Sequence, residues 1–207
     1  MRKVDPVRHG EKRREILEAA GRCFVRDGFR GASIAAICAE ARISPGHLYH
    51  YFSSKEAIVA AMAEIRLEEA AARFGQLAEG SSVLEAFLAQ LDRLNSRRHG
   101  AVQPLLLEML SEAGRDPAMA KVVQDTSRAG RALLAEVLRK GQARGEIDTS
   151  LDPEMAAALL MSLMDGAKAM SIRAPDLDGK AAVELLKMMI GRFLAPGGQA
   201  AEDRPHT

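Results

Sequence analysis

The sequence predicts an all-α protein of about nine helices. Along most of the 207-residue chain, apolar residues recur every three or four positions, the spacing that gathers them on one face of a helix. Serine, aspartate and proline stand where these periodic segments begin, and glycine stands where several of them end. No segment alternates apolar and polar residues as a half-buried strand would, and no internal repeat occurs.

The first 55 residues predict three short helices followed by the start of a longer one. Residues 11–27 carry apolar side chains on one face of a helix, and Gly28 follows where a left-handed C-cap would stand. Ser33 is a good N-cap for a second helix, and Ser44 for a third with Pro45 in its first turn. About three residues separate these two helices, so they predict a helix-turn-helix.

The segment SSKE at 53–56 predicts a capping box, in which Ser53 accepts a hydrogen bond from the Glu56 amide. This box opens a long fourth helix that extends to about residue 75. Five more helices are expected near residues 83–94, 104–113, 117–143, 153–173 and 178–195.

The starts of the later helices are marked by proline and aspartate. Pro104 and Pro117 are expected at first helical positions, and Asp152 and Asp178 as N-caps. A polar tail expected to be disordered closes the chain. The expected division is a helix-turn-helix domain, a connecting helix, a regulatory and dimerisation domain and the tail, at residues 1–54, 55–75, 76–196 and 197–207.

Charge is unevenly distributed, although the net charge is only +1. Residues 1–55 hold eleven lysines and arginines against six aspartates and glutamates, whereas the remaining 152 residues carry a net charge of −4. A basic module on an acidic body is the distribution expected for a protein that binds a polyanion. The alternative is a solvated helix on which arginines pair with neighbouring glutamates.

Composition and cysteine usage exclude several classes of protein. A hydrophobic content of 47% and a charged content of 28% are ordinary for a globular protein. No apolar run approaches the roughly 18 residues of a membrane span, and the basic N-terminus lacks the apolar stretch of a leader. Cys23 and Cys38 have no metal-site spacing and are expected to be small core residues. We therefore expect a cytoplasmic protein with no metal, no cofactor and no membrane partner.

Aromatic residues gather in the segment ISPGHLYHYF at 43–52. Both tyrosines, one of the six phenylalanines and two of the five histidines lie within residues 47–52. A core would space such residues at helical intervals, so a contiguous run indicates a functional surface. The other histidines, His9, His99 and His206, are expected to be isolated in loops or tails.

Three motifs within residues 12–62 carry a family resemblance. They are ILEAAGRCFVRDGF at 16–29, IAAICAEARIS at 34–44 and LYHYFSSKEAI at 48–58. Together they resemble the DNA-binding domain of the TetR family of bacterial transcriptional regulators. Arg42 departs from the family pattern, because it occupies a turn position where the family usually has glycine. A residue with a side chain at this position carries backbone strain if its φ is positive.

This resemblance implies a DNA-binding transcriptional regulator whose third helix lies in the major groove. His47 would read base edges, and Gly46 would let the backbone approach. Tyr49, His50 and Tyr51 have polar tips on flat bodies, which suit phosphate oxygens and thymine methyls; packing at the edge of the core is the alternative for the two tyrosines. Leu48 and Phe52 are expected to point into the core. The residues expected at the DNA are Ser33, Arg42, Ser44, Pro45, Gly46, His47, Tyr49, His50, Tyr51 and Lys55.

The family's regulatory domain implies a homodimer formed by the last two helices. Apolar stripes on these helices are the expected contact, and plain core packing is the alternative. The stripe residues are Met155, Leu159, Leu163, Met170, Leu185, Met189 and Phe193.

The expected function is that of a repressor released from a palindromic double-stranded DNA operator by a small-molecule effector of unidentified structure. Activation instead of repression stays open at this point, although the resemblance favours a repressor. Asp165 and Arg128 are candidate charged groups in an effector cavity, although an interface or surface position is the favoured interpretation for each. One alternative is a nucleic-acid-binding protein without small-molecule control, and another is an enzyme acting on a ligand in the C-terminal helices. The sequence has no nucleophile elbow, phosphate loop or HExxH motif, so we expect no enzyme.

Overall fold

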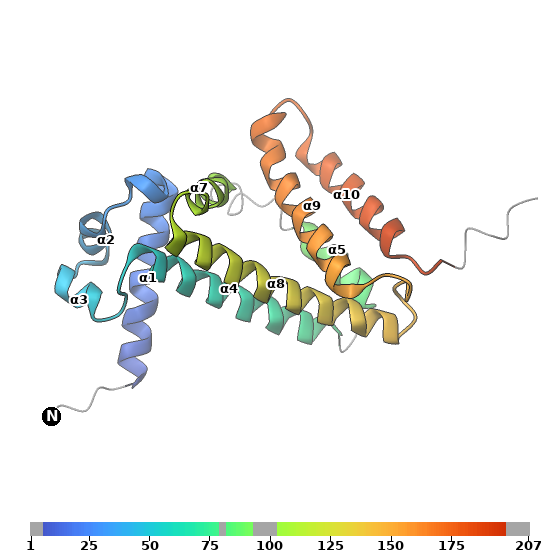
Figure 1. Ribbon diagram of the computed structural model, residues 1–207, viewed down its shortest axis with the longest axis horizontal. Coiled ribbons are helices and arrows are strands. Elements are labelled where there is room, and N and C mark those ends of the chain that lie inside the picture. Colours follow the sequence, from blue (N-terminus) through green and yellow to red (C-terminus); the bar gives the residue numbers. More distant parts are fainter. Residues whose placement is uncertain (1–5, 79–81, 93–102, 198–207) are drawn as a thin grey trace, which may run out of the picture. The chain divides into compact units, whose positions relative to one another are not determined.

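The computed structural model describes residues 6–78, 82–92 and 103–197, and every regular element within these ranges is a helix (Figure 1). The predicted all-α class is therefore confirmed. The tail expected to be disordered lies outside the described residues from position 198 onward. The nine helices of the described ranges are α1 (Pro6–Gly31), α2 (Ile34–Ala41), α3 (Pro45–Tyr49), α4 (Lys55–Ala78), α5 (Val83–Leu91), α7 (Gln103–Ala113), α8 (Pro117–Ala143), α9 (Pro153–Arg173) and α10 (Gly179–Leu194).

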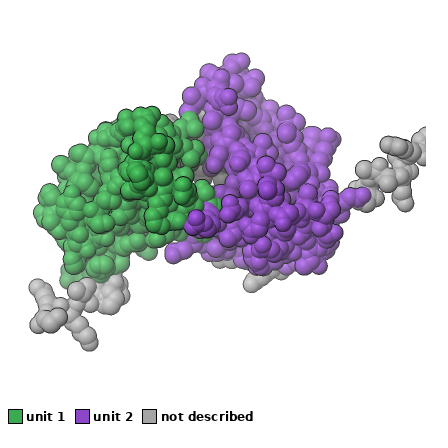
Figure 2. Space-filling view, in the orientation of Figure 1, with its two compact units in different colours: residues 1–67, 101–127 green, residues 68–100, 128–207 purple. Residues whose placement is uncertain are grey.

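The chain forms two compact units, which Figure 2 shows in different colours. The first comprises residues 1–67 and 101–127, and the second comprises residues 68–100 and 128–207. Helix α7 therefore belongs to the same unit as the N-terminal helices and contacts α1. Helices α4 and α8 each contribute residues to both units. The domain boundaries expected from the sequence stay a prediction.

One apolar core holds the first unit together. α1 contacts α2 and α7, and α2 contacts α3. Leu48 and Phe52, at and just beyond the end of α3, are buried in this core as predicted. Cys23 and Cys38 are also buried there as free thiols, which confirms their assignment as core residues. Burying each large apolar side chain contributes about 1.5–3 kcal/mol, so α3 is anchored despite its short length.

The helix-turn-helix forms as predicted, with both of its predicted caps. The Ser33 hydroxyl accepts a hydrogen bond from the Ala36 amide at 3.1 Å, and the Ser44 hydroxyl accepts one from the His47 amide at 3.2 Å. Between the two caps, Arg42 has φ 54° and ψ 48°, which is the left-handed conformation. Among the described residues it is the one non-glycine residue with positive φ. The backbone strain expected at this departure from glycine is therefore present.

The cap of α4 differs from the prediction. Its N-terminus is capped by Ser54, whose hydroxyl accepts a hydrogen bond from the Ala57 amide at 3.2 Å. The helix begins at Lys55, so the predicted pairing of Ser53 with Glu56 is wrong. Two adjacent serines satisfy the capping pattern equally well, and the path of the chain out of α3 decides between them.

Other helix ends also differ from the prediction. α1 begins at Pro6, whereas the sequence predicted a start at residue 11. The earlier start was missed because this part of the helix is polar and shows no apolar period. Gly28 has the positive φ expected of it, 71°, but its ψ of 172° interrupts the helix for one residue, after which helix continues to Gly31. α7 begins at Gln103, so Pro104 occupies its second position.

The second unit has a core of its own, to which α5, α8, α9 and α10 contribute. α10 contacts both α5 and α9, and Figure 1 shows α9 and α10 running alongside each other. The predicted caps are confirmed, because Asp152 accepts a hydrogen bond from the Met155 amide at 2.7 Å and Asp178 accepts one from the Lys180 amide at 2.8 Å. In the described part of the chain, no helix combines the length and apolar character needed to cross a membrane.

Candidate functional site

Helix α3 presents most of its side chains to solvent. Pro45, Gly46, His47 and Tyr49 are exposed, and Tyr49 keeps 54% of its surface accessible. Leu48 is the exception, with no exposed surface. A Cβ atom placed on Gly46 would meet no atom within 4 Å, so this side of the helix is open to close approach by a large ligand. The burial of one residue thus fixes the helix while its other residues stay available for contact.

Three histidines surround the half-buried ring of Tyr51. The centroids of the His47 and His50 rings lie 5.5 Å and 5.3 Å from that of Tyr51. His9 stacks on the same ring at 4.6 Å. The prediction that His9 is isolated in a loop is wrong, because α1 begins earlier than expected and carries His9 to this cluster. No motif marks His9, and only extending the first helix backward would have found it.

The other two histidines expected to be isolated cannot be placed beside this cluster. His99 and His206 lie outside the described residues.

The basic residues of the first unit divide into paired and unpaired groups. Arg22 and Arg26 lie 2.7 Å and 3.5 Å from the carboxylate of Glu40. The hydrogen bond from Arg22 lowers the pKa of the Glu40 carboxyl. Lys12 likewise pairs with Glu15 at 2.7 Å. Arg42 is exposed and makes no ion pair with any described residue, so its charge is available to an external anion.

The Lys55 ammonium contacts the main chain of α1. Its Nζ donates a hydrogen bond to the Phe29 carbonyl at 2.6 Å and lies 4.3 Å from the centroid of the Phe29 ring. An ammonium has three N–H donors, so two remain for other partners. The expected contact of Lys55 with DNA stays a prediction. Ser33, Ser44 and His50, the other residues expected at the DNA, are exposed at the surface of the same unit.

Helices α9 and α10 carry exposed apolar stripes. Met170, which was expected to belong to the α9 stripe, is half-buried rather than exposed. Met188 of α10 is exposed, although it was not among the expected stripe residues. The expected stripe residues that are exposed, from 39% for Leu163 to 62% for Met155, are Met155, Leu159, Leu163, Leu185, Met189 and Phe193. Exposed apolar residues at helical spacing are typical of interaction surfaces, and the contact with a second copy stays a prediction.

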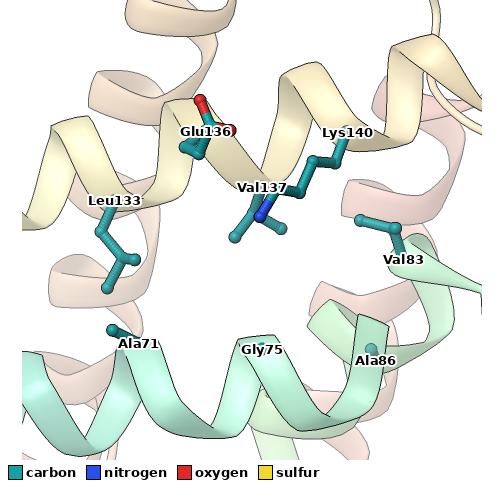
Figure 3. Close-up of a pocket in the computed structure, with 8 residues that line it drawn as sticks. All are labelled: Ala71, Gly75, Val83, Ala86, Leu133, Glu136, Val137 and Lys140. Carbon is teal, nitrogen blue, oxygen red and sulfur yellow. The ribbon is translucent and has the colours of Figure 1, made fainter. Parts of the chain in front are cut away.

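A cavity of about 210 Å³ lies in the second unit between α4, α5 and α8 (Figure 3). Figure 3 shows the Lys140 ammonium turned into the opening, whereas the Glu136 carboxylate points away from α4. Neither Asp165 nor Arg128 lines this cavity, and Asp165 instead accepts a hydrogen bond from Lys168 at 2.7 Å. The lining is mostly apolar and consists of Ala71, Gly75, Val83, Ala86, Leu133, Glu136, Val137 and Lys140.

The fold and the exposed α3 define a helix-turn-helix DNA-binding protein with a second helical unit. Residues 16–62 match the family model "Bacterial regulatory proteins, tetR family". Residues 79–195 match the family model "BetI-type transcriptional repressor, C-terminal". The chain belongs to the TetR family of bacterial transcriptional regulators.

Individual relatives agree with this assignment. The chain is 34% identical over 183 residues to the HTH-type transcriptional regulator UidR of Escherichia coli K12, covering 88% of this chain and 92% of UidR. It is 29% identical to the HTH-type transcriptional repressor AcnR of Corynebacterium glutamicum, over 74% of this chain and 78% of AcnR. The solved structure of Salmonella enterica GusR superposes with a TM-score of 0.75 at 29% identity, over 94% of this chain and 99% of GusR. The protein is therefore a DNA-binding transcriptional regulator.

Proposed function

We propose that this regulator is a repressor that binds a near-palindromic operator as a homodimer and leaves it when a small-molecule effector binds. The single observation that carries the proposal is the exposed α3, on which His47 and Tyr49 face solvent while Leu48 is buried. A short helix held in this way can enter the major groove without losing its packing. Chromosomal DNA as the target places the protein in the bacterial cytoplasm.

The residues of the first unit have distinct proposed roles at the DNA. His47 reads base edges, while Gly46 lets the backbone of α3 come close to the duplex. Arg42 pairs with a phosphate, because its guanidinium is exposed and has no partner among the described residues. Phosphate and sugar contacts from α2, α3 and the two residues after α3 complete the set, through Ser33, Ser44, Pro45, Tyr49, His50 and Tyr51.

Dimerisation follows from how little DNA one α3 can read. A single recognition helix contacts only a few base pairs, so two in fixed register are needed for useful specificity. The stripes on α9 and α10 support pairing with a second copy, because their apolar side chains stay 39–62% exposed in the described part of the chain. An interface of two identical faces gives a twofold axis, and a twofold axis requires a palindromic operator.

The cavity between α4, α5 and α8 is the proposed effector site. Its apolar walls suit the body of an organic molecule, and the Lys140 ammonium at its mouth suits a polar or anionic group. α4 begins beside the recognition helix and carries Ala71 and Gly75 on the cavity wall, so one continuous helix joins the two sites. A ligand that favours one packing of these helices would change the spacing of the two recognition helices.

Selection of bound fragments from genomic DNA tests the proposal. The expected result is a near-palindrome with half-sites about one helical turn, or a multiple of it, apart. His47→Ala should relax the choice at one or two of its base pairs, at a cost of about 1–3 kcal/mol in discrimination. Recovery of fragments that share no sequence would contradict the proposal and favour non-specific nucleic-acid binding.

The effector is tested on the operator complex. Compounds are titrated while operator release and ligand binding are both followed. An effector should change operator affinity roughly 5- to 150-fold, and the operator must weaken its binding by the same factor. Chemical turnover of a bound compound would instead support the enzyme alternative.

A further inference from the structure

The main-chain groups of Phe29 are held from two sides by charged side chains. Its N–H donates a hydrogen bond to the Glu108 carboxylate of α7 at 2.6 Å, and its carbonyl accepts one from Lys55 at the start of α4 at 2.6 Å. The same ammonium lies over the buried Phe29 ring. Hydrogen bonds to charged groups are roughly twice as strong as neutral ones, so the end of α1 is fixed by α4 and α7 together.

Gly28, the residue before Phe29, makes this arrangement possible. Its positive φ interrupts α1, which takes the Phe29 N–H out of the helical hydrogen-bond pattern and leaves it for another acceptor. A Cβ atom on Gly28 would lie 2.6 Å from a carboxylate oxygen of Glu108, so any larger residue would push that carboxylate from its present place. One turn further along α7, Glu112 pairs with Arg30 at 2.7 Å. Two successive residues of α1 are therefore held by α7.

We propose that Glu108 and Lys55 are positioning residues for operator binding. They act on DNA binding through Phe29, by fixing the end of α1 and thereby the α2–α3 pair that packs with it. Lys55, on this proposal, serves the Phe29 carbonyl rather than a DNA phosphate. The inference rests on the proposed operator function, but it assigns roles to side chains that the recognition helix does not contain.

Packing explains how contacts at Phe29 reach the DNA-reading residues. α1 contacts α2, and α2 contacts α3, so a displacement of the end of α1 is passed to α3 through packed side chains. Lys55 is the first residue of α4 and follows α3 closely along the chain. A dimer must place two copies of α3 in register, so a small displacement of each copy loses several operator contacts at once. Non-specific binding requires no such register and should be insensitive to the same displacement.

The test compares operator and non-specific DNA affinity over a range of salt concentrations for full-length variants. Glu108→Ala and Lys55→Met should each weaken operator binding roughly tenfold, within the usual range of coupling between sites. Non-specific affinity and the slope of log affinity against log salt should not change, because no phosphate contact is lost. Glu108→Gln keeps an acceptor for the Phe29 N–H and should retain most of the affinity. Ser111→Ala removes a hydroxyl of the same helix that accepts a hydrogen bond from Arg115, not from Phe29, and should behave like the parent.

Three outcomes would overturn the inference. Parent-like operator affinity in Glu108→Ala would remove the role of α7. A salt slope lower by about one in Lys55→Met would make Lys55 a phosphate contact. Hydrogen exchange of the unliganded protein tests the positioning of α3 without any operator. Failure of this inference can therefore be distinguished from failure of the proposed function. Glu108→Ala should speed exchange at Phe29 and across residues 45–52, whereas a change confined to Phe29 would contradict positioning of α3.

Discussion

The imidazole of His9 stacks on the phenol ring of Tyr51, with centroids 4.6 Å apart and planes inclined by 29°. His9 lies in the first turn of α1, and Tyr51 follows the end of α3, so the contact joins the start of one helix to the recognition helix. His50 approaches both rings, at 6.0 Å from His9 and 5.3 Å from Tyr51. His9, His50 and Tyr51 therefore form one aromatic cluster at the point where the chain leaves α3.

His9→Ala should weaken operator binding about 2- to 10-fold, because an aromatic pair of this kind contributes about 0.5–1.5 kcal/mol. Fluorescence anisotropy with labelled operator measures the effect. His9→Phe preserves the stack and should restore most of the affinity. An equal loss in both variants would assign the role of His9 to its ring nitrogens instead of its stacking.

Arg42→Gly should separate stability from DNA binding. Glycine adopts φ 54° without a Cβ penalty, so the variant should gain about 0.5–1 kcal/mol in free energy of unfolding. Its affinity for all DNA sequences should fall, and the salt slope should drop by about one. Arg42→Ala should show the same DNA effect without the gain in stability. Chemical denaturation and salt-dependent titrations measure the two quantities, and an unchanged salt slope in both variants would rule out a phosphate contact.

Placing aspartate at both Leu163 and Leu185 should yield monomers in analytical ultracentrifugation. These side chains are 39% and 56% exposed in the single chain, so the substitutions leave its core intact while a paired interface would bury the new charges. Operator binding should be lost together with the dimer. Leu110→Asp, at a leucine of α7 that is 45% exposed, is the control and should stay dimeric. Monomers that bind the complete operator with parental affinity would contradict the dimer proposal.

Glu146 should make the second unit sensitive to acid. Its carboxylate accepts hydrogen bonds from the Ser82 hydroxyl at 2.8 Å and the Val83 amide at 2.5 Å, at the start of α5. The Ser82 hydrogen bond and then the α5 amides lower the pKa of Glu146 in the folded protein. Its stabilisation is therefore complete above the ordinary glutamate pKa and is lost as the pH falls through the lower folded-state value.

Glu146→Gln should lower the free energy of unfolding by about 1 kcal/mol at neutral pH, as for a lost helix cap. Thermal unfolding followed from neutral to acid pH measures the difference, which should shrink as Glu146 of the parent becomes protonated. Glu184→Gln removes a carboxylate from an exposed pair with Lys187 and should have little effect. A difference between parent and Glu146→Gln that stays constant with pH would contradict the charged cap.

The helices and their caps were predicted from local sequence patterns. Ser33, Ser44, Asp152 and Asp178 cap the helices that the sequence assigned to them, because a cap needs only an oxygen and an amide two or three residues further on. Leu48 and Phe52 were expected in the core from their spacing of four residues together with the family resemblance, and both are buried. Arg42 was singled out because the family that the sequence resembles usually has glycine at this turn position, and its φ is indeed positive.

The same local patterns could not predict contacts between segments that lie far apart in the sequence. Phe29 and Glu108 are separated by 79 positions, and Phe29 and Lys55 by 26, so neither periodicity nor capping rules connect them. Lys55 looked like a DNA contact from its place in a motif, and only the packing of α1 against α4 shows where its ammonium lies. The sequence by itself determined which segments are helical, because helix formation depends on neighbours within one turn. The tertiary structure alone decided which side chains hold α1 to α4 and α7, because that depends on how separate helices pack.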